Sequence, residues 1–270
     1  MKPPLPPIAT SLEFFSATDT GRARSNNEDS VAVEEVAALV VLADGMGGYN
    51  AGEVASGMVT SFIKTELGRW ILEASGNASD ADVRRAMDIC VDNANRAIFN
   101  AANSNPQYAG MGTTLVVGAF RDTRLLMGHV GDSRGYRLRN GRLVQITRDH
   151  SLLQEQIDAG LITAEQAAFS SNKNLVTRAV GVEDTVLLEM HLHDVLPGDV
   201  YLLCSDGLSD MLDDETIGQL LLANDTLDEA GAALIDAAND AGGKDNIAVI
   251  LVRHRTGNTA PARSWWPFKR

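Results

Sequence analysis

Four aspartates lie at the ends of runs of apolar residues, and together they could bind divalent metal ions. Each has a glycine within two residues, and the four are Asp44, Asp132, Asp206 and Asp245. Because the ends of buried strands lie at the rim of a core, these carboxylates could converge on one cleft. Converging carboxylates repel one another unless cations neutralise them, and all-oxygen ligand sets suit Mg²⁺ or Mn²⁺ better than zinc. A turn explains any single Asp-Gly pair equally well, but the four sites together favour a metal centre.

An arginine followed by two acids adds a candidate phosphate ligand. The segment Arg24-Ser-Asn-Asn-Glu28-Asp29 places a guanidinium group shortly before two carboxylates. A guanidinium can hold a phosphate with a fork of N–H donors, while the acids face metal-bound water. The motif therefore predicts phosphoryl chemistry beside the metal ions.

The elements that must position these residues come in groups of strands and groups of long helices. Strands are expected over six runs rich in β-branched or apolar residues, at 30–33, 38–43, 114–120, 125–130, 200–204 and 247–252. Helices are expected where apolar residues recur with helical spacing, at 51–67, 80–102 and 227–241. This grouping predicts an α+β fold rather than a series of βαβ units.

One domain is expected over residues 11–255, because no linker divides the chain and no repeat of fixed period occurs. Residues 1–10 are rich in proline and predict an extended lead-in. Two capping boxes, beginning at Ser151 and Thr163, predict two short helices within an insertion or flap over residues 151–181.

Residues 256–270 differ in composition from the rest of the chain. They contain Trp265 and Trp266, together with Lys269 and Arg270 at the end. One interpretation is an unstructured terminus. The other is an aromatic and basic anchor for a partner or a membrane surface.

The overall composition excludes several classes of protein. Lys plus Arg is 23 and Asp plus Glu is 36, which gives a formal net charge of −13 and argues against general nucleic-acid binding. The two cysteines, Cys90 and Cys204, are too few for a disulfide framework and favour a reducing, cytoplasmic location. No run reaches the roughly 18 apolar residues of a membrane span, and no apolar signal-peptide core follows the first residues.

Taken in order, the motifs resemble those of the metal-dependent PP2C-type protein phosphatases in their bacterial form. The resembling segments together span residues 16–252: 21–30, 43–48, 112–114, 130–134, 148–151, 176–181, 205–208 and 244–246. A single segment is only moderately specific, whereas the ordered set is highly specific. The resemblance implies a four-layer αββα sandwich, with two antiparallel sheets face to face and helices outside.

The resemblance also implies roles for individual residues. Asp44 would bridge two metal ions, with the Gly45 carbonyl on one of them, while Asp206 and Asp245 would hold the other. Asp132 together with Asp206 would hold the third ion often found in bacterial members.

The resemblance assigns Arg24 to the substrate phosphate, with Glu28 and Asp29 acting near or through metal-bound water. Residues 151–181 would be the family's mobile flap. In animal enzymes a histidine in the Asp-Gly-His-Gly segment is thought to protonate the leaving group. Here that position is Met46, which cannot donate a proton, so a metal-bound water is favoured as general acid over His150.

The function expected from these features is hydrolysis of phosphoserine and phosphothreonine in proteins by a hydroxide that bridges two Mn²⁺ or Mg²⁺ ions. The two core ions would lie about 3.5–4 Å apart, and no phosphoenzyme is expected. The alternative is a catalytically silent module that binds phosphorylated proteins. The expected partners are substrates of a cognate Ser/Thr kinase, with type VI secretion control as one possible setting, and the chain is expected to be a monomer.

Two other motifs invite chemistry and are set aside. Cys90 and Arg96 fit the Cys-x5-Arg spacing of cysteine-dependent phosphatases, but the segment is predicted to lie within a helix and not in a phosphate-binding loop. His191 and His193 are expected on the solvent face of a strand, and not at a metal. Cys204 is expected in the core.

Overall fold

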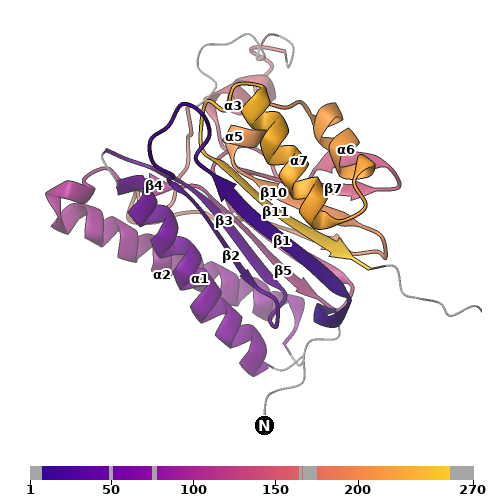
Figure 1. Cartoon of the computed structure of the whole chain (residues 1–270). Helices are drawn as coiled ribbons and strands as arrows, with labels where there is room; N and C mark the ends of the chain where they lie inside the picture. The colour runs from indigo at the N-terminus through magenta and orange to yellow at the C-terminus, as the bar shows by residue number, and fades with distance from the viewer. Residues whose placement is uncertain (1–7, 49–50, 75–77, 164–165, 167–174, 256–270) are drawn as a thin grey trace, which may run out of the picture.

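The computed structural model of this chain describes residues 8–48, 51–74, 78–163, 166 and 175–255. Two antiparallel sheets face each other, and helices cover the outer face of each sheet (Figure 1). This is the αββα sandwich that the sequence predicts. None of the helices in these ranges is long and apolar enough to cross a membrane.

The first sheet has the strand order β1-β11-β10-β7-β8. Its strands are β1 (Leu12–Asp19), β7 (Arg134–Arg139), β8 (Arg142–Gln145), β10 (Val200–Cys204) and β11 (Ile247–His254). The second sheet has the order β2-β3-β5-β6-β9, with β4 paired to β3. Its strands are β2 (Asp29–Glu34), β3 (Leu39–Met46), β4 (Gly112–Thr113), β5 (Leu115–Arg121), β6 (Arg124–Val130) and β9 (Glu189–Asp194).

The helices pack in two groups outside the sheets. Against the second sheet lie α1 (Ala51–Ala74) and α2 (Asp80–Ser104), and against the first lie α5 (Asp206–Ser209), α6 (Asp214–Ala223) and α7 (Leu227–Asp240). Helix α3 (Leu152–Asp158) and two short 3₁₀ turns, η1 (Ala9–Ser11) and η2 (Pro106–Tyr108), complete the described elements.

Three apolar layers hold the sandwich together because successive side chains of each buried strand point to opposite faces. In β3, Val41 packs toward α1 and α2, whereas Val40 and Leu42 pack between the two sheets. In β10, Leu202 packs toward α6 and α7, whereas Tyr201 packs between the sheets. Because both faces of these strands are buried, the strands are apolar on both faces. Short apolar runs therefore mark them in the sequence.

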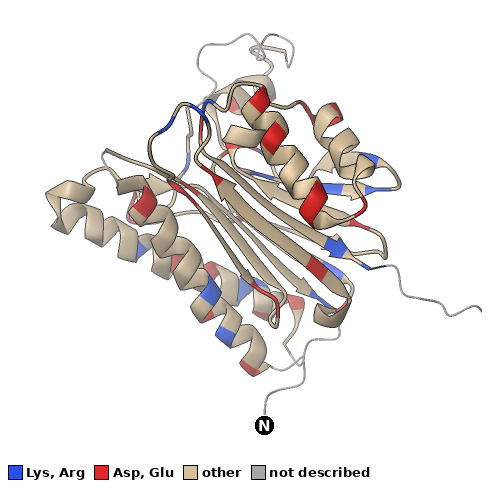
Figure 2. Cartoon of the chain, in the orientation of Figure 1, with Lys and Arg blue, Asp and Glu red and all other residues tan. Residues whose placement is uncertain are grey.

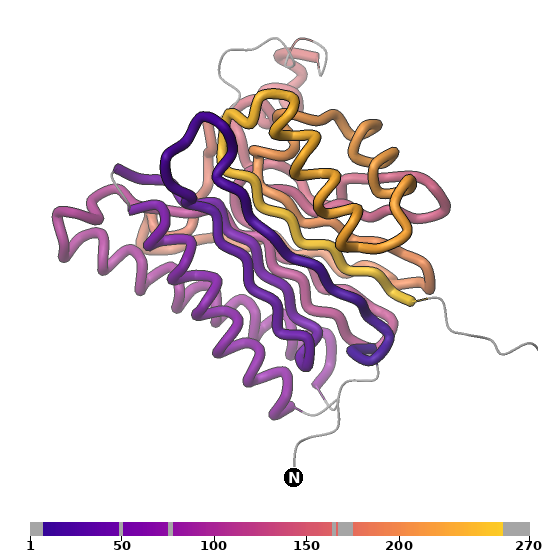
Figure 3. The backbone as a smooth tube through the Cα atoms, viewed as in Figure 1, coloured from indigo at the N-terminus to yellow at the C-terminus, as the bar shows by residue number. Residues whose placement is uncertain are grey.

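The loops at one end of the sandwich meet. Figure 3 shows the loop between β1 and β2 beside the loop that precedes β11. The N–H groups of Arg22 and Ala23 both donate to the carbonyl of Gly243, at 2.7 and 3.1 Å. This contact joins the arginine motif to the last of the four aspartates.

Some predicted bounds change. Strand β3 begins at Leu39, because Ala38 is in the left-handed region with φ 52°, and it continues through Asp44 and Gly45 to Met46. The extended lead-in predicted for 1–10 is not found at its end, where Ile8 is buried and Ala9–Ser11 form a 3₁₀ turn. Residues 1–7 of that segment, and the whole of 256–270 with its tryptophans, lie outside the described residues.

The segment 151–181 begins as the sequence predicts. The Ser151 hydroxyl accepts from the N–H of Gln154 at 3.3 Å and caps α3. The second capping box forms in both directions, since Thr163 and Gln166 exchange hydrogen bonds of 2.8 and 3.2 Å, whereas the first has only the bond to the Ser151 hydroxyl. The helix predicted after it falls on residues 164–165 and 167–174, which lie outside the described residues, so the flap stays a prediction.

Candidate metal centre

A cleft of about 250 Å³ opens at the end of the sandwich where the loop between β1 and β2 meets the loop that precedes β11. All but one of the predicted site residues line it, namely Arg24, Glu28, Asp44, Gly45, Asp132, Asp206 and Asp245. The exception is Asp29, which is buried beside Asp44. Residues from five separate stretches of the chain therefore come together as predicted.

The sheet register explains how the first pair of acids meets. Asp29 at the start of β2 lies directly opposite Asp44 in β3. The Asp44 N–H donates to the Thr114 hydroxyl at 3.0 Å, which is itself 2.7 Å from the Ser133 hydroxyl. The Asp44 backbone is therefore held by side-chain contacts as well as by the sheet ladder.

The second pair of acids comes from neighbouring strands of the other sheet. Asp206 begins α5 directly after β10, and Asp245 directly precedes Asn246 and β11. A β-carbon on Gly207 would lie 1.9 Å from the Asn246 carbonyl oxygen, so only glycine permits the two segments to approach this closely. Gly45 is restricted in the same way, because a β-carbon there would lie 2.1 Å from the Gly52 carbonyl oxygen.

Asn246 joins the arginine motif to the end of β11. Its amide donates to the carbonyls of Thr20 and Asn26 at 2.9 and 2.8 Å, and its Oδ1 accepts from the N–H of Glu28 at 2.8 Å. No role was predicted for this buried residue. Its place in the Lys-Asp-Asn segment was the only available signal, because its three partners are more than 200 residues away.

Four buried carboxylates in and beside the cleft resist ionisation, namely Asp29, Asp44, Asp132 and Asp206. Burial, followed by the charges of Asp132, Asp210 and Asp245, raises the pKa of Asp206 to about 8. Burial above all, and to a lesser degree the charge of Asp245, raises the pKa of Asp29 to about 7. A divalent cation would reverse this effect by favouring the ionised forms.

The same causes act on the other two acids. Burial raises the pKa of Asp132 to about 6, and the pKa of Asp44 rises well above its usual range through burial and its acidic neighbours. In addition, Asp29 Oδ1 is buried without a hydrogen-bond partner, although Oδ2 accepts from the Ser205 hydroxyl at 2.7 Å. A cluster of repelling oxygen ligands with an orphaned buried oxygen fits Mg²⁺ or Mn²⁺ and does not fit zinc.

Arg24 lies in the cleft as predicted, but it has a partner that the sequence did not indicate. Its Nη2 donates to Asp245 Oδ2 at 2.7 Å. Half of the Arg24 side chain is exposed to solvent, at 51%. The guanidinium is thus within reach of both the Asp245 carboxylate and the open cleft.

Met46 lines the cleft, whereas His150 does not. Both ring nitrogens of His150 have partners, since Nδ1 accepts from the Gly131 N–H at 3.1 Å and Nε2 lies 3.1 Å from Glu189 Oε2. This buried and engaged imidazole is poorly placed to protonate a leaving group. The geometry therefore favours water, the alternative preferred from the sequence.

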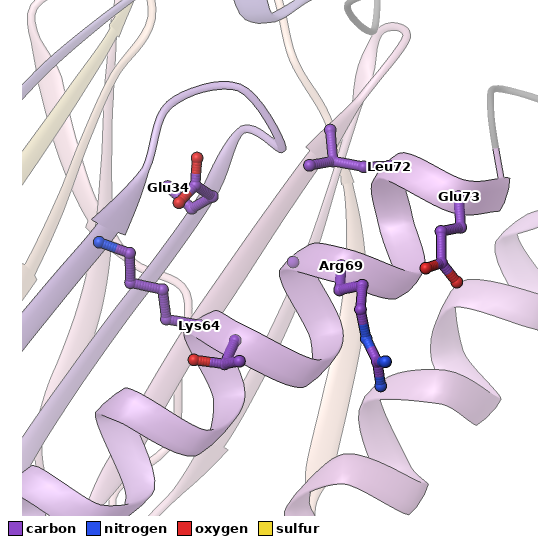
Figure 4. Close-up of a pocket in the computed structure, with 7 residues that line it drawn as sticks. Glu34, Lys64, Arg69, Leu72 and Glu73 are labelled. Atoms are coloured by element: carbon purple, nitrogen blue, oxygen red, sulfur yellow. The ribbon is translucent and has the colours of Figure 1, made fainter. Parts of the chain in front are cut away.

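A second, larger cavity of about 620 Å³ lies between the end of β2 and the C-terminal half of α1. Figure 4 shows that it is lined by side chains of both charges, including Glu34, Lys64, Arg69 and Glu73. It contains none of the predicted site residues.

Figure 2 shows that acidic residues also lie along α7, so only part of the net negative charge belongs to the cleft.

Three of the four residues set aside from the sequence are placed as expected. Cys90 lies within α2 and not in a phosphate-binding loop, Cys204 is fully buried in the core, and His191 in β9 is exposed and contacts Glu189 at 2.8 Å. His193 differs, because it is half-buried and its Nε2 is buried without a hydrogen-bond partner. Among the described residues, neither His191 nor His193 belongs to a group of three close metal ligands.

Known proteins resemble this chain in sequence and in structure. Residues 20–251 match the profile of the family described as Protein phosphatase 2C. The chain is 40% identical over 258 residues to the serine/threonine protein phosphatase PstP of Mycobacterium tuberculosis, a match that covers 94% of this chain and 48% of PstP. The chain thus spans about half the length of that relative.

Solved structures show the same likeness. The catalytic domain of PstP in complex with two manganese ions superimposes with a TM-score of 0.77 at 38% identity, covering 90% of this chain and 97% of that one. PppA, a key regulatory component of the type VI secretion system in Pseudomonas aeruginosa, superimposes with a TM-score of 0.78 at 32% identity, covering 90% of this chain and 97% of PppA.

Proposed function

Because this chain belongs to the protein phosphatase 2C family, we propose that it hydrolyses phosphoserine and phosphothreonine in proteins with the help of bound Mn²⁺ or Mg²⁺. The observation that carries the proposal is the convergence of Asp44, Asp132, Asp206 and Asp245 on one cleft that also contains Arg24. Relatives named serine/threonine phosphatases, one of them solved with two manganese ions, support it.

Each acid has a specific role in this proposal. Asp44 would bridge the two core ions, and the Gly45 carbonyl would bind one of them. Asp206 and Asp245 would hold the other, and Asp132 together with Asp206 would hold a third. The oxygen atoms that these five residues offer, and the raised pKa values of Asp44, Asp132 and Asp206, support the assignment.

The remaining residues act on water and on the substrate. When bound, the metal ions supply Lewis-acid activation of water and offset the charge of the phosphoryl group. Arg24 exchanges Asp245 for the substrate phosphate and orients it with its fork of donors. Glu28 and Asp29 orient water at the base of the cleft. No side chain needs to act as a nucleophile.

The alternative of a silent phosphoprotein-binding module is not supported by the relatives, which are named phosphatases. Such a module would bind a phosphorylated protein at the cleft without hydrolysing its phosphate. In this chain the four aspartates and Arg24 are all present and all meet, which favours an active enzyme.

Hydrolysis of a phosphothreonine peptide and of p-nitrophenyl phosphate tests the proposal. Activity is expected with Mn²⁺, lost with EDTA and unaffected by okadaic acid. Binding of the phosphopeptide without turnover at saturating Mn²⁺ would instead support the silent module.

We propose phosphorylated substrates of a cognate Ser/Thr kinase, and the likeness to PppA supports type VI secretion control as one setting. The cysteine content supports a cytoplasmic location, since both cysteines are free thiols. A monomer, a single phosphatase domain over 11–255 and a flap over 151–181 are proposed with it.

A further inference from the structure

His150 and Gly131 are joined by two hydrogen bonds next to the cleft. The His150 N–H donates to the Gly131 carbonyl at 2.9 Å, and the Gly131 N–H donates to His150 Nδ1 at 3.1 Å. Because Nδ1 accepts a hydrogen bond, the proton of the neutral imidazole is on Nε2. Nε2 therefore donates to Glu189 Oε2, 3.1 Å away.

The imidazole is fixed on its remaining sides as well. His150 is 8% exposed, and its ring stacks on that of fully buried His129, with centroids 4.7 Å apart and planes at 12°. His129 is held in turn by a 2.7 Å contact from Nε2 to the Arg148 carbonyl. A ring held in this way presents its acceptor to Gly131 in one orientation.

Gly131 directly precedes Asp132 and has an unusual backbone conformation. Its φ is +101°, and a β-carbon there would lie 2.7 Å from Thr114 Cγ2. Because this peptide sets the direction of the Asp132 side chain, whatever holds Gly131 also aims Asp132. The contacts from His150 do so from outside the cleft.

We infer that His150 and Glu189 are positioning residues that hold Asp132 in place for the third metal ion. The inference rests on the proposed function, which assigns that ion to Asp132. Glu189 orients the imidazole, the imidazole holds Gly131, and Gly131 aims Asp132. Neither residue lines the cleft, so neither contacts the metal or the substrate.

A metal site at His129, His150 and Glu189 is the competing interpretation. One ligand atom from each residue lies within 4.8 Å of the others. However, the Gly131 N–H occupies Nδ1 of His150 and keeps the proton on Nε2, so this nitrogen has no free lone pair. Arg178 Nη1 also lies 3.1 Å from Nε2, where it would repel a cation. The hydrogen-bond chain gives each ring nitrogen of His150 a partner, with Arg178 beside the Nε2–H group and not hydrogen-bonded to it.

Calorimetric titration of the EDTA-stripped full chain with Mn²⁺ tests the inference. The wild type is expected to show a tight class of sites and a weaker class that Asp132→Asn removes. His150→Gln, whose amide cannot reach the Nδ1 position, is expected to weaken that second class about tenfold, as for one lost hydrogen bond. His150→Asn places Oδ1 near the Nδ1 position and is expected to stay within about twofold of the wild type.

Variants of the neighbouring residues complete the design. His191→Ala removes only the exposed contact to the other Glu189 oxygen, so it is expected to titrate as the wild type does. If His150→Gln does not fold, Glu189→Ala on edge strand β9 replaces it, with weakening expected in the same class, whereas Glu189→Gln keeps an acceptor and is expected to bind normally.

Two results would overturn the inference. One is a His150→Gln or Glu189→Ala isotherm identical to that of the wild type, and the other is a weaker class of sites that Asp132→Asn does not affect. Phosphopeptide hydrolysis at saturating Mn²⁺ is measured separately. Its absence from a wild type that binds both classes would contradict the proposed function and leave this inference intact.

Discussion

The guanidinium of Arg24 and the carboxylate of Asp245, 221 residues apart in the sequence, lie 2.7 Å from each other across the cleft. The two side chains are 51% and 29% exposed, so solvent weakens the ion pair and it is easily exchanged. A metal ion at Asp245 and a phosphate at Arg24 would each replace one partner. Metal binding and substrate binding are therefore expected to favour each other.

Replacement of Arg24 separates these two effects. Arg24→Ala is expected to raise KM for a phosphopeptide about tenfold, as for one lost charge-assisted hydrogen bond. The affinity for Mn²⁺ is expected to stay the same or to rise, because Asp245 loses a competing cation. Steady-state kinetics and a Mn²⁺ titration measure the two quantities. An unchanged KM, or weaker Mn²⁺ binding, would contradict the role given to Arg24.

The raised pKa of Asp206 predicts a dependence of stability on pH in EDTA. Its pKa of about 8 in the folded protein exceeds the unfolded value of about 3.9. The folded state therefore holds an extra proton between these values, and the stability it contributes is lost as the pH rises toward 8. Asp206→Asn removes this effect, because asparagine resembles the protonated acid.

The test compares the free energies of unfolding of both proteins in EDTA. We expect Asp206→Asn to gain stability over the wild type as the pH rises from 5 to 8, by at most about 1.4 kcal/mol per pH unit. Parallel pH profiles would show that Asp206 is not desolvated as the structure indicates.

Asn246 is expected to be essential for the shape of the cleft. Asn246→Ala removes three hydrogen bonds, leaves buried backbone groups without partners, and is expected to cost about 3 kcal/mol of stability. Asn103→Ala, at an exposed position of α2, is the matched control and is expected to cost little. Denaturant unfolding measures both, and equal effects would contradict the bracing role of Asn246.

Cys90 is expected to play no part in catalysis. The residue lies within α2, where burial and the charge of Glu66 raise the pKa of its thiol. Cys90→Ser is therefore expected to retain wild-type turnover. Thiol reagents are expected to affect the activity of the variant and of the wild type to the same extent. Loss of activity in a folded Cys90→Ser protein would instead revive the Cys-x5-Arg interpretation.

The sequence predicted the parts of the fold that apolar runs mark. The bounds predicted for strand β10, 200–204, match the structure, and helix α2 extends only slightly beyond its predicted end, to Ser104. Helix α1 continues about two turns beyond its predicted end at 67, to Ala74. Strand β9 alternates polar with apolar residues at a sheet edge, and it was predicted only as the strand that carries His191 and His193, without bounds. Its charged Glu189 gave no sign of a buried partner.

The residues of the candidate site were predicted because their types and order are specific to the family. The contacts among them were not, because they depend on segments distant in the sequence. Arg24 meets Asp245, and Ser205 donates to Asp29, only once the two sheets face each other. Likewise, the bond from Gly131 to His150 requires the tight backbone that follows β6, which no local pattern specifies.

The most direct test of the central claim is hydrolysis of a phosphothreonine peptide by Asp206→Asn in saturating Mn²⁺, beside the wild type. The variant keeps the volume of the side chain but loses the negative charge that binds the ion. Turnover is expected to fall at least about a hundredfold, as when a group that stabilises the transition state is lost, while circular dichroism stays unchanged. Near-wild-type turnover by the folded variant would contradict the metal centre proposed for this cleft.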